Sequence, residues 1–254
     1  MKKISLILCV FILCVACQRR GGNYSSNSND RHSQQTSSRR SVEERHRSTE
    51  RATTSGQSVD IPRSKSSSRT YSGSEIFDMY SSAVFMVYTR NDVHESQGSA
   101  FFISNTGIAV SNYHVFESTY QGLEEFHMSD GSVYKLKNVI AKSKEADVFI
   151  FEVDGGGKKF NFIPISSRSP RVGEKVYTIG SPQGLENTFS SGEISQLRGS
   201  DLIQISAPID HGSSGGVLLN EYGEAIGITT AGIDDSGANL NFAVSIKLVQ
   251  QLLQ

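Results

Sequence analysis

From residue 83 to residue 244 the sequence is a succession of short runs rich in β-branched and aromatic residues. Turn residues separate the runs, as in Asn105-Thr106-Gly107 and Ser129-Asp130-Gly131. Runs of this kind are typical of strands, and no helix-length amphipathic segment interrupts them. We therefore predict an all-β fold with strands at 83–89, 99–103, 108–111, 133–140, 148–153, 175–179, 188–194, 202–205, 217–219, 225–229 and 240–244.

A helix is expected at each end of this strand-rich region. Ser74 is a candidate N-cap for a short helix that has Ile76, Phe77 and Tyr80 on its apolar face. After Ser245 the apolar spacing becomes that of a closing amphipathic helix. The strands fall into two sets of about six, which predicts two packed antiparallel β-barrels with a cleft between them.

Residues 1–17 form a separate segment with the pattern of a secretory signal. A basic head, Met1-Lys2-Lys3, precedes a 13-residue apolar run from Ile4 to Ala16 that is too short to span a membrane. We therefore expect the protein to be exported. All three cysteines lie in this segment, so the rest of the chain has no thiol and depends on its core for stability.

The end of this segment, Leu13-Cys14-Val15-Ala16-Cys17, resembles a bacterial lipobox, in which the last cysteine becomes the acylated N-terminus. It predicts lipidation of Cys17 and a membrane-anchored lipoprotein of the cell envelope or periplasm. Cys14 stands where an aliphatic residue is usual. Simple cleavage after Ala16 is therefore the open alternative, because small residues precede both kinds of cleavage site.

Residues 18–73 contain too few apolar side chains to form a core. They hold 11 Lys and Arg residues and 5 Asp and Glu residues, a net charge of +6. Residues 74–254 hold 12 Lys and Arg residues and 21 Asp and Glu residues, a net charge of −9. We expect a disordered, solvated spacer between a membrane and the globular part, and no nucleic-acid partner. A surface adhesin that binds anionic polymers through this segment is an alternative that depends on net charge alone.

The sequence Gly212-Ser213-Ser214-Gly215-Gly216 lies between two apolar, strand-like runs. Its glycines let the backbone turn sharply and leave a serine hydroxyl beside unpaired N–H groups, as a nucleophilic serine requires. A flexible Gly/Ser turn is the other interpretation of such a cluster when it stands alone. A catalytic interpretation therefore needs a base and an acid elsewhere in the chain.

A candidate base and a candidate acid both lie at strand ends. His114 follows the run 108–111, where its ring can point into a cleft, and Asp147 precedes the apolar run 148–153. Considered singly, each has an ordinary alternative, a hydrogen-bonded histidine for His114 and a strand-initiating turn aspartate for Asp147. Together His114, Asp147 and Ser214 follow one of the known chain orders of a serine triad.

Seven ordered motifs across residues 75–254 resemble the HtrA (Deg) family of trypsin-fold serine proteases. The resemblance implies two six-stranded Greek-key barrels, one at 74–165 with the base and the acid, and one at 166–254 with the serine and the C-terminal helix. The motifs are Gly98-Ser99-Ala100-Phe101, Asn112-Tyr113-His114-Val115, Ala146-Asp147-Val148, Gly180-Ser181-Pro182-Gln183-Gly184-Leu185, Ser191-Gly192-Glu193-Ile194-Ser195, Gly212 to Gly216, and Asn241-Phe242-Ala243-Val244.

The resemblance also implies a role for each site residue. His114 is the general base, Asp147 fixes the tautomer of its ring, and Ser214 is the nucleophile. The N–H groups of Gly212 and Ser214 form the oxyanion hole. Ser213 replaces the Asn or Asp that is usual before the nucleophile, and the absence of Asp argues against the activation switch of digestive proteases.

Aliphatic residues occupy the positions that line the primary specificity pocket in that family, namely Ile209, Ile233 and Leu240. We expect the pocket to favour small or medium aliphatic residues before the scissile bond and to reject Lys and Arg, whose charge would be buried without a partner. The expected protein is a serine endopeptidase for cell-envelope or extracellular polypeptides, including misfolded ones. A catalytically silent lipoprotein that binds polypeptides through the same fold is the alternative.

Many members of this family carry a C-terminal PDZ domain, and we expect none here because the sequence ends at Gln254. Self-association through the N-terminal segment stays open. No metal or other cofactor is expected, since the sequence has no cysteine beyond Cys17 and no H-E-x-x-H pair.

Overall fold

The structure is a computed structural model that describes residues 61–62, 68–117, 119–181, 187–210, 212–233 and 240–254. The leader, Cys17 and most of the expected spacer lie outside these residues, so the structure does not bear on those predictions. In the described part of the chain, no helix combines the length and the apolar composition needed to cross a membrane.

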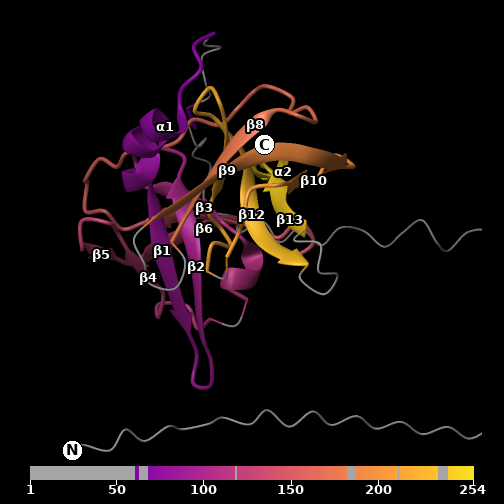
Figure 1. The fold of residues 1–254 in the computed structure, drawn as a ribbon. Coiled ribbons are helices and arrows are strands. Elements are labelled where there is room, and N and C mark those ends of the chain that lie inside the picture. The colour runs from indigo at the N-terminus through magenta and orange to yellow at the C-terminus, as the bar shows by residue number, and fades with distance from the viewer. Residues whose placement is uncertain (1–60, 63–67, 118, 182–186, 211, 234–239) are drawn as a thin grey trace, which may run out of the picture. The chain divides into compact units, whose positions relative to one another are not determined.

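The described residues form two antiparallel β-sheet halves (Figure 1), which confirms the predicted all-β fold. The first is a seven-stranded sheet in the order β5-β4-β1-β2-β3-β7-β6, and the second is a closed barrel in the order β10-β13-β12-β11-β8-β9. The strands are β1 Val84–Arg90, β2 Glu95–Phe102, β3 Ile108–Ser111, β4 Glu125–His127, β5 Val133–Tyr134, β6 Leu136–Ser143, β7 Val148–Val153, β8 Lys175–Gly180, β9 Thr188–Arg198, β10 Leu202–Ile205, β11 Val217–Asn220, β12 Ala225–Ile233 and β13 Leu240–Ser245. The helices are α1 Gly73–Tyr80, the 3₁₀ turns η1 Ser81–Ala83 and η2 Tyr113–Val115, and α2 Ile246–Leu252.

The first half has seven strands, whereas the sequence pattern indicated five runs there and the family resemblance implied six strands. The additional strand is β4, which the sequence did not reveal because its three residues include a single apolar side chain, Phe126. The expected run 133–140 divides into β5 and β6, with Phe126 of β4 paired to Tyr134 of β5. Strand β5 has only two residues. Strands β5 and β6 are the two edges of the described sheet.

Three apolar clusters hold the fold together. The cluster of the first half is aromatic, with Phe126 and Phe151 at a ring distance of 4.9 Å, and the cluster inside the barrel is aliphatic. The third cluster contains side chains from β1, β2 and β3 of the first half and from β11, β12 and β13 of the barrel. It also includes Ile76 of α1 and Val249 of α2. Burial of this shared cluster fixes the two halves against each other and thereby positions side chains at their junction.

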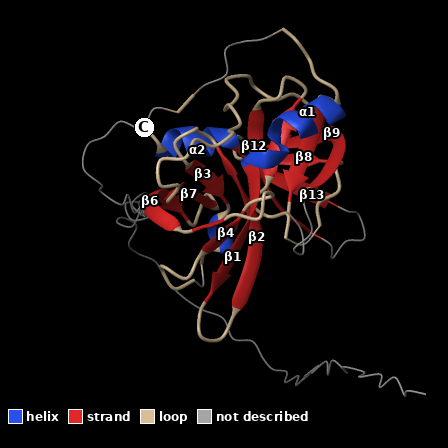
Figure 2. Ribbon diagram, turned by 90° about the vertical axis from the view of Figure 1, so that its left-hand side faces the viewer, coloured by secondary structure: helices blue, strands red, loops and turns tan. Residues whose placement is uncertain are grey.

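Helix α1 precedes the first half in sequence but packs on the barrel. The ring of Phe77 meets Phe189 of β9 edge-to-face at 5.8 Å, and Phe189 stacks on Tyr177 of β8 at 5.6 Å. Figure 2 shows α1 beside β8 and β9 and places α2 at the same end of the described structure. The segment that leads into β1 is therefore part of the packed structure.

The N-cap of α1 is Ser72 and not the expected Ser74. Ser72 Oγ accepts a hydrogen bond from the Glu75 N–H at 3.3 Å, and the Glu75 carboxylate accepts one from the Ser72 N–H at 2.8 Å. The Ser72 N–H holds the pKa of Glu75 below its usual value. This reciprocal pair is a capping box, which the Ser-x-x-Glu spacing at 72–75 encodes and which starts the helix at Gly73.

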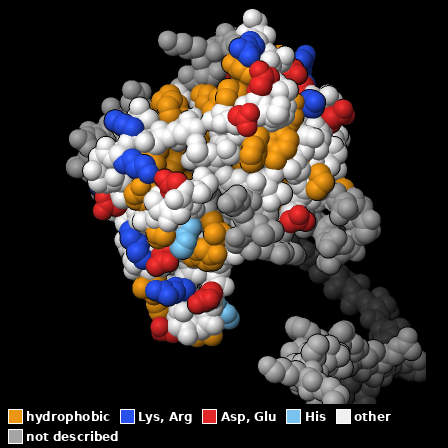
Figure 3. All heavy atoms as spheres, turned by 60° about the vertical axis from the view of Figure 1, so that its left-hand side comes forward, with side chains coloured by type: hydrophobic (Ala, Val, Ile, Leu, Met, Phe, Trp, Pro, Cys, Tyr) orange, Lys and Arg blue, Asp and Glu red, His pale blue; other side chains and the backbone are white. Residues whose placement is uncertain are grey.

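Charged side chains of both signs are interspersed on the face shown in Figure 3. Surface ion pairs of the first half include Lys135 with Glu125 at 3.1 Å and Lys137 with Glu152 at 2.8 Å. Exposed pairs of this kind contribute about 0.2–1 kcal/mol each. The apolar clusters, rather than these pairs, therefore account for most of the stability.

Candidate active site

His114 and Asp147 lie side by side because the strands that precede and follow them are paired. Strand β3 ends at Ser111, three residues before His114, and Ser111 pairs with Phe149 of β7, two residues after Asp147. The His114 Nδ1 lies 3.0 Å from Oδ1 and 2.9 Å from Oδ2 of Asp147. Oδ1 also accepts the His114 backbone N–H at 3.0 Å. The carboxylate thus orients both the ring and the backbone of the histidine.

Asp147 has a left-handed backbone with φ of 53°, and among the described residues it is the only non-glycine with positive φ. Its carbonyl accepts a hydrogen bond from Asn112 Nδ2 at 3.1 Å, and its N–H donates to the Lys144 carbonyl at 3.2 Å. Asn112 is fully buried. Aspartate tolerates this conformation better than most residues, and strain of this kind is often found at functional sites.

The loop that carries Ser214 is held against β2 by Ser99, which is fully buried. The Ser99 N–H donates to the Ser214 carbonyl at 2.7 Å, and Ser99 Oγ donates to the Gly212 carbonyl at 2.8 Å. The same Oγ accepts the Ser181 N–H at 2.9 Å. A single serine of the first half therefore links two loops of the second half.

The barrel holds the same loop from its other side through Thr229 of β12. The Gly215 N–H donates to the Thr229 carbonyl at 2.8 Å, and Thr229 Oγ1 donates to the Ser213 carbonyl at 2.7 Å. The Ser213 N–H in turn donates to the Asp210 carbonyl at 3.0 Å. These bonds fix the peptide planes on both sides of Ser214.

Two N–H groups of this loop, those of Gly212 and Ser214, donate no hydrogen bond within the described residues. Gly212 has φ of 93°, which only glycine adopts at little cost. Two neighbouring donors on a fixed loop are the arrangement that stabilises a developing oxyanion. Their role as an oxyanion hole stays a prediction.

No hydrogen bond joins the Ser214 hydroxyl to the His114 ring in the part of the chain that the structure describes. The His114 side chain is 42% exposed, so its ring is accessible from solvent. Hydrogen bonds between nucleophile and base are often long or misaligned until substrate binds. The structure therefore brings His114 and Asp147 together, whereas the third member of the predicted triad is not bonded to them.

A cavity of about 70 Å³ lies next to Ser213 and is lined by Ile209, one of the three residues expected in the specificity pocket. Leu240 is half-buried at the start of β13 and does not line this cavity, and the side chain of Ile233 lies outside the described structure. Asp210 also lines the cavity, with hydroxyl-bearing residues such as Thr178 and Ser190. The lining is thus more polar than the aliphatic pocket that the sequence predicted.

Three residues that hold the site together were not assigned a role from the sequence, namely Ser99, Asn112 and Thr229. Ser99 and Asn112 belong to motifs that carry the family resemblance, so a signal for them was present. Thr229 had no such signal. Its role depends on a contact between β12 and the loop, which only the folded chain reveals.

The site belongs to a stretch of sequence that matches a known domain family. Residues 98–228, just over half of the 254-residue chain, match the family described as "Trypsin-like peptidase domain". The crystal structure of the serine endoprotease from Yersinia pestis superposes with a TM-score of 0.64 and 27% sequence identity. The superposition covers 71% of this chain and 65% of that one.

Curated relatives of the chain are serine proteases by name. "Serine protease HTRA1A" of Danio rerio is 33% identical over 66% of this chain and 36% of its own length. "Probable periplasmic serine endoprotease DegP-like" of Rhizobium meliloti is 34% identical over 59% of this chain and 31% of its own length. The matched part of this chain thus spans about a third of the length of these relatives. Fold, motifs and family match together show that the chain belongs to the trypsin-like peptidase family and resembles its HtrA and DegP-like members.

Proposed function

We propose that the protein is a serine endopeptidase that hydrolyses polypeptides of the cell envelope with Ser214, His114 and Asp147. The observation that carries this proposal is the His114–Asp147 pair, which lies on the sheet against which the Ser214 loop is fixed. The N–H groups of Gly212 and Ser214, which donate no hydrogen bond to a described residue, support it, and so does the similarity to serine proteases.

The proposed reaction proceeds in two acyl-transfer steps. His114 Nε2 removes the proton from Ser214 Oγ as that oxygen attacks the scissile carbonyl, and then delivers the proton to the leaving amine. Asp147 keeps the ring proton on Nδ1 and stabilises the charged imidazolium. Water then attacks the acyl-enzyme with the same base. Each N–H donor of Gly212 and Ser214 is expected to lower the barrier by about 3 kcal/mol.

An activated-serine probe tests this proposal. A fluorophosphonate should label the folded protein, and peptide mapping should place the label on Ser214 rather than on the adjacent Ser213. The variant Ser214→Ala, which removes the nucleophile and leaves the backbone unchanged, should not be labelled. Absence of label on folded wild-type protein would instead favour a protein that binds polypeptides without cleaving them.

We further propose that residues 1–17 direct export and that Cys17 carries a lipid anchor. The lipobox-like sequence supports the anchor, and the word "periplasmic" in the name of the Rhizobium meliloti relative supports export. A palmitate analogue supplied to expressing cells should label the wild type and not Cys17→Ser, with Cys14→Ser as the matched control. An unlabelled wild type would favour simple cleavage after Ala16.

A further inference from the structure

Asn112 is a fully buried amide beside the proposed catalytic pair, and the proposed mechanism gives it no role. It directly precedes η2, the 3₁₀ turn that contains His114. A polar group that leaves water on folding costs free energy unless it forms hydrogen bonds inside the protein. The bonds that the Asn112 side chain forms, and the one that it lacks, therefore indicate why an asparagine occupies this position.

Capping of the turn does not explain this asparagine. Asn112 is the N-cap of η2, and its backbone has the extended conformation of a cap, with φ of −75° and ψ of 147°. Asparagine is favoured at such positions because its side-chain oxygen accepts an N–H of the first turn. Here the side chain forms no capping bond to the described residues of η2. Its amide is directed elsewhere.

The amide reaches the segment that carries Asp147. Asn112 Nδ2 donates to the Asp147 carbonyl at 3.1 Å, and the two residues are 35 positions apart in the sequence. Asn112 Oδ1 is buried too, and no described residue donates a hydrogen bond to it. Exchange of the amide oxygen and nitrogen would set an acceptor against the carbonyl, so the bond to Asp147 determines how the amide is turned.

The carbonyl that Asn112 holds belongs to a residue with a strained backbone. Asp147 has φ of 53°, and a left-handed residue other than glycine persists only where its surroundings favour that conformation. Its own N–H donates to the Lys144 carbonyl at 3.2 Å, a bond within the same turn. The bond from Asn112 comes from outside the turn. It therefore ties the conformation of Asp147 to the segment that leads into His114.

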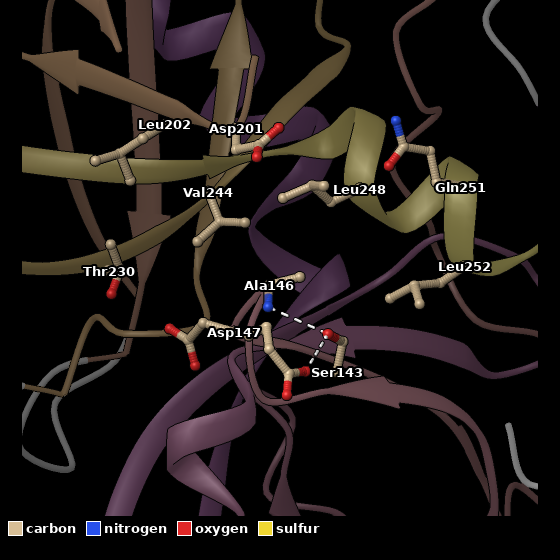
Figure 4. A pocket seen from close by; sticks show the side chains of 11 residues that line it. Ser143, Ala146, Asp147, Asp201, Leu202, Thr230, Val244, Leu248, Gln251 and Leu252 are labelled. Atoms are coloured by element: carbon tan, nitrogen blue, oxygen red, sulfur yellow. Dashed lines mark hydrogen bonds between the residues drawn. The ribbon is translucent and has the colours of Figure 1, made fainter. Parts of the chain in front are cut away.

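Packing leaves one side of Asp147 open. Asp147 lines a cavity of about 620 Å³ where the two halves and α2 meet. Figure 4 shows Ala146 and Asp147 on one wall of this cavity, with Val244 and Leu248 across it. A residue that faces open space is not fixed by close contacts on that side. The hydrogen bonds of Asp147 are therefore needed to hold its left-handed backbone.

The backbone of Asp147 in turn sets the direction of its carboxylate. In the present conformation the two carboxylate oxygens lie 3.0 and 2.9 Å from His114 Nδ1. Without the bond from Asn112, the φ of Asp147 can relax toward the negative values that L-residues prefer. This change rotates the Cα–Cβ bond and moves the carboxylate away from the ring.

We propose that Asn112 is a positioning residue that acts on His114 through Asp147. Its amide holds the Asp147 carbonyl so that the carboxylate keeps the ring proton on Nδ1 and leaves Nε2 as the base. The unpaired Oδ1 indicates that the residue serves this geometry rather than stability, since an apolar side chain would bury no polar atom. The effect on the tautomer concerns the His114–Asp147 pair itself, and only its consequence for the rate rests on the proposed function.

The tautomer of His114 can be measured without cleavage. In full-length Ser214→Ala protein, histidine labelled with ¹⁵N in the ring gives two nitrogen signals per residue, and those of His114 are identified by their loss in His114→Gln. When the ring is neutral, their chemical shifts report which nitrogen carries the proton. The proton should reside mainly on Nδ1 when Asn112 is present. Asn112→Leu, which has the same branched shape and no polar atom, should lower the Nδ1–H fraction about twofold or more.

A second asparagine provides the matched control. Asn161 Nδ2 also donates to a backbone carbonyl, that of Met79 at 2.7 Å, but its bonds lead to α1 and η1 rather than to Asp147. Asn161→Leu should leave the tautomer of His114 unchanged. Urea unfolding of Asn112→Leu should give a midpoint close to that of the wild type, because removal of the unpaired Oδ1 offsets loss of the donated bond.

Kinetics of the otherwise wild-type enzyme give a second measurement. Asn112→Leu should lower kcat by up to about 100-fold, as a misplaced catalytic group does, and leave KM within about twofold. Because Asn112 acts through Asp147, the loss should not add to that of Asp147→Asn when the two substitutions are combined.

The outcomes separate positioning from a structural role. An unchanged tautomer in Asn112→Leu, or kcat losses that add fully in the double variant, would overturn the proposal. Asn112→Ala removes the same polar atoms with a smaller side chain, and failure of both variants to fold would show a structural role instead. The NMR measurement needs no activity, so it decides the matter even if the fluorophosphonate does not label Ser214.

Discussion

Replacing Asp147 by Asn is expected to lower kcat by about 10⁴-fold while the protein stays folded. Asparagine has the shape of aspartate and also tolerates the left-handed backbone at this position, where φ is 53°. Its amide oxygen can still accept the His114 backbone N–H, as Oδ1 does at 3.0 Å. The substitution therefore removes the charge and one acceptor with little other change.

The loss comes from the tautomer of His114. Its Nδ1 lies 2.9 Å from Asp147 Oδ2, so a carboxylate keeps the ring proton on Nδ1 and leaves Nε2 free to accept the proton of Ser214. An amide NH₂ at the Oδ2 position would donate to Nδ1 instead. The ring proton then resides on Nε2, and His114 no longer serves as a base toward Ser214.

The kcat of Asp147→Asn is compared with that of the wild type by single-turnover and steady-state kinetics, on a peptide with an aliphatic residue before the scissile bond. Asp154→Asn is the matched control, because Asp154 is an exposed carboxylate one residue beyond β7 and should leave kcat within about twofold of the wild type, as surface substitutions usually do. Urea unfolding of both variants checks that each remains folded. If Asp147→Asn retained kcat within tenfold of the wild type, the proposed role of Asp147 would be wrong.

The fold was largely predictable because short strands carry a local pattern. Each run predicted from β-branched and aromatic content overlaps a strand in the structure, although β2 begins at Glu95, four residues before the predicted start. The placement of His114 just after β3 and of Asp147 just before β7 also followed from the local sequence. The antiparallel pairing of these two strands then brings the two side chains together, a step that strand prediction alone does not supply.

Contacts between residues far apart in sequence were not predictable. The hydroxyl of Ser99 bonds to Gly212, 113 positions later in the chain. Both residues belong to motifs of the family resemblance, but neither motif specifies that the two are bonded to each other. The left-handed backbone of Asp147 depends in the same way on the buried amide of Asn112, 35 positions earlier. The 620 Å³ cavity arises only where segments of both halves meet. Local patterns determine elements, whereas the site depends on how the elements pack.

Replacing Gly215 by Ala is expected to destabilise the protein by more than about 4 kcal/mol, which is exceptional for a single substitution. A Cβ at Gly215 would lie 2.0 Å from the Ser99 carbonyl oxygen and 2.3 Å from Ser111 Oγ. These two oxygens cannot easily move away from the new Cβ, because Ser111 Oγ itself donates a hydrogen bond to the Ser99 carbonyl at 2.7 Å. Gly215 is also fixed by its N–H, which donates to Thr229 at 2.8 Å.

A second glycine separates the steric clash from the backbone strain. Gly122 has φ of 94°, close to the 90° of Gly215, but a Cβ there would have no atom within 4 Å. Gly122→Ala should therefore cost only the left-handed backbone penalty of about 1–2 kcal/mol. Urea unfolding of both variants gives the difference, which measures the contact between the Ser214 loop and β2.

The same substitution connects this contact to the proposed chemistry. Relief of the clash requires the loop to move away from Ser99, which would break the Ser99–Ser214 bond and shift the N–H groups of Gly212 and Ser214. Gly215→Ala molecules that remain folded at low temperature should therefore lose fluorophosphonate labelling, whereas Gly122→Ala should retain it. Similar free energies of unfolding for Gly215→Ala and Gly122→Ala would show that the Ser214 loop can move away from Ser99 without loss of stability. The close packing of Ser99 against Gly215 would then not be what holds Ser214 in place.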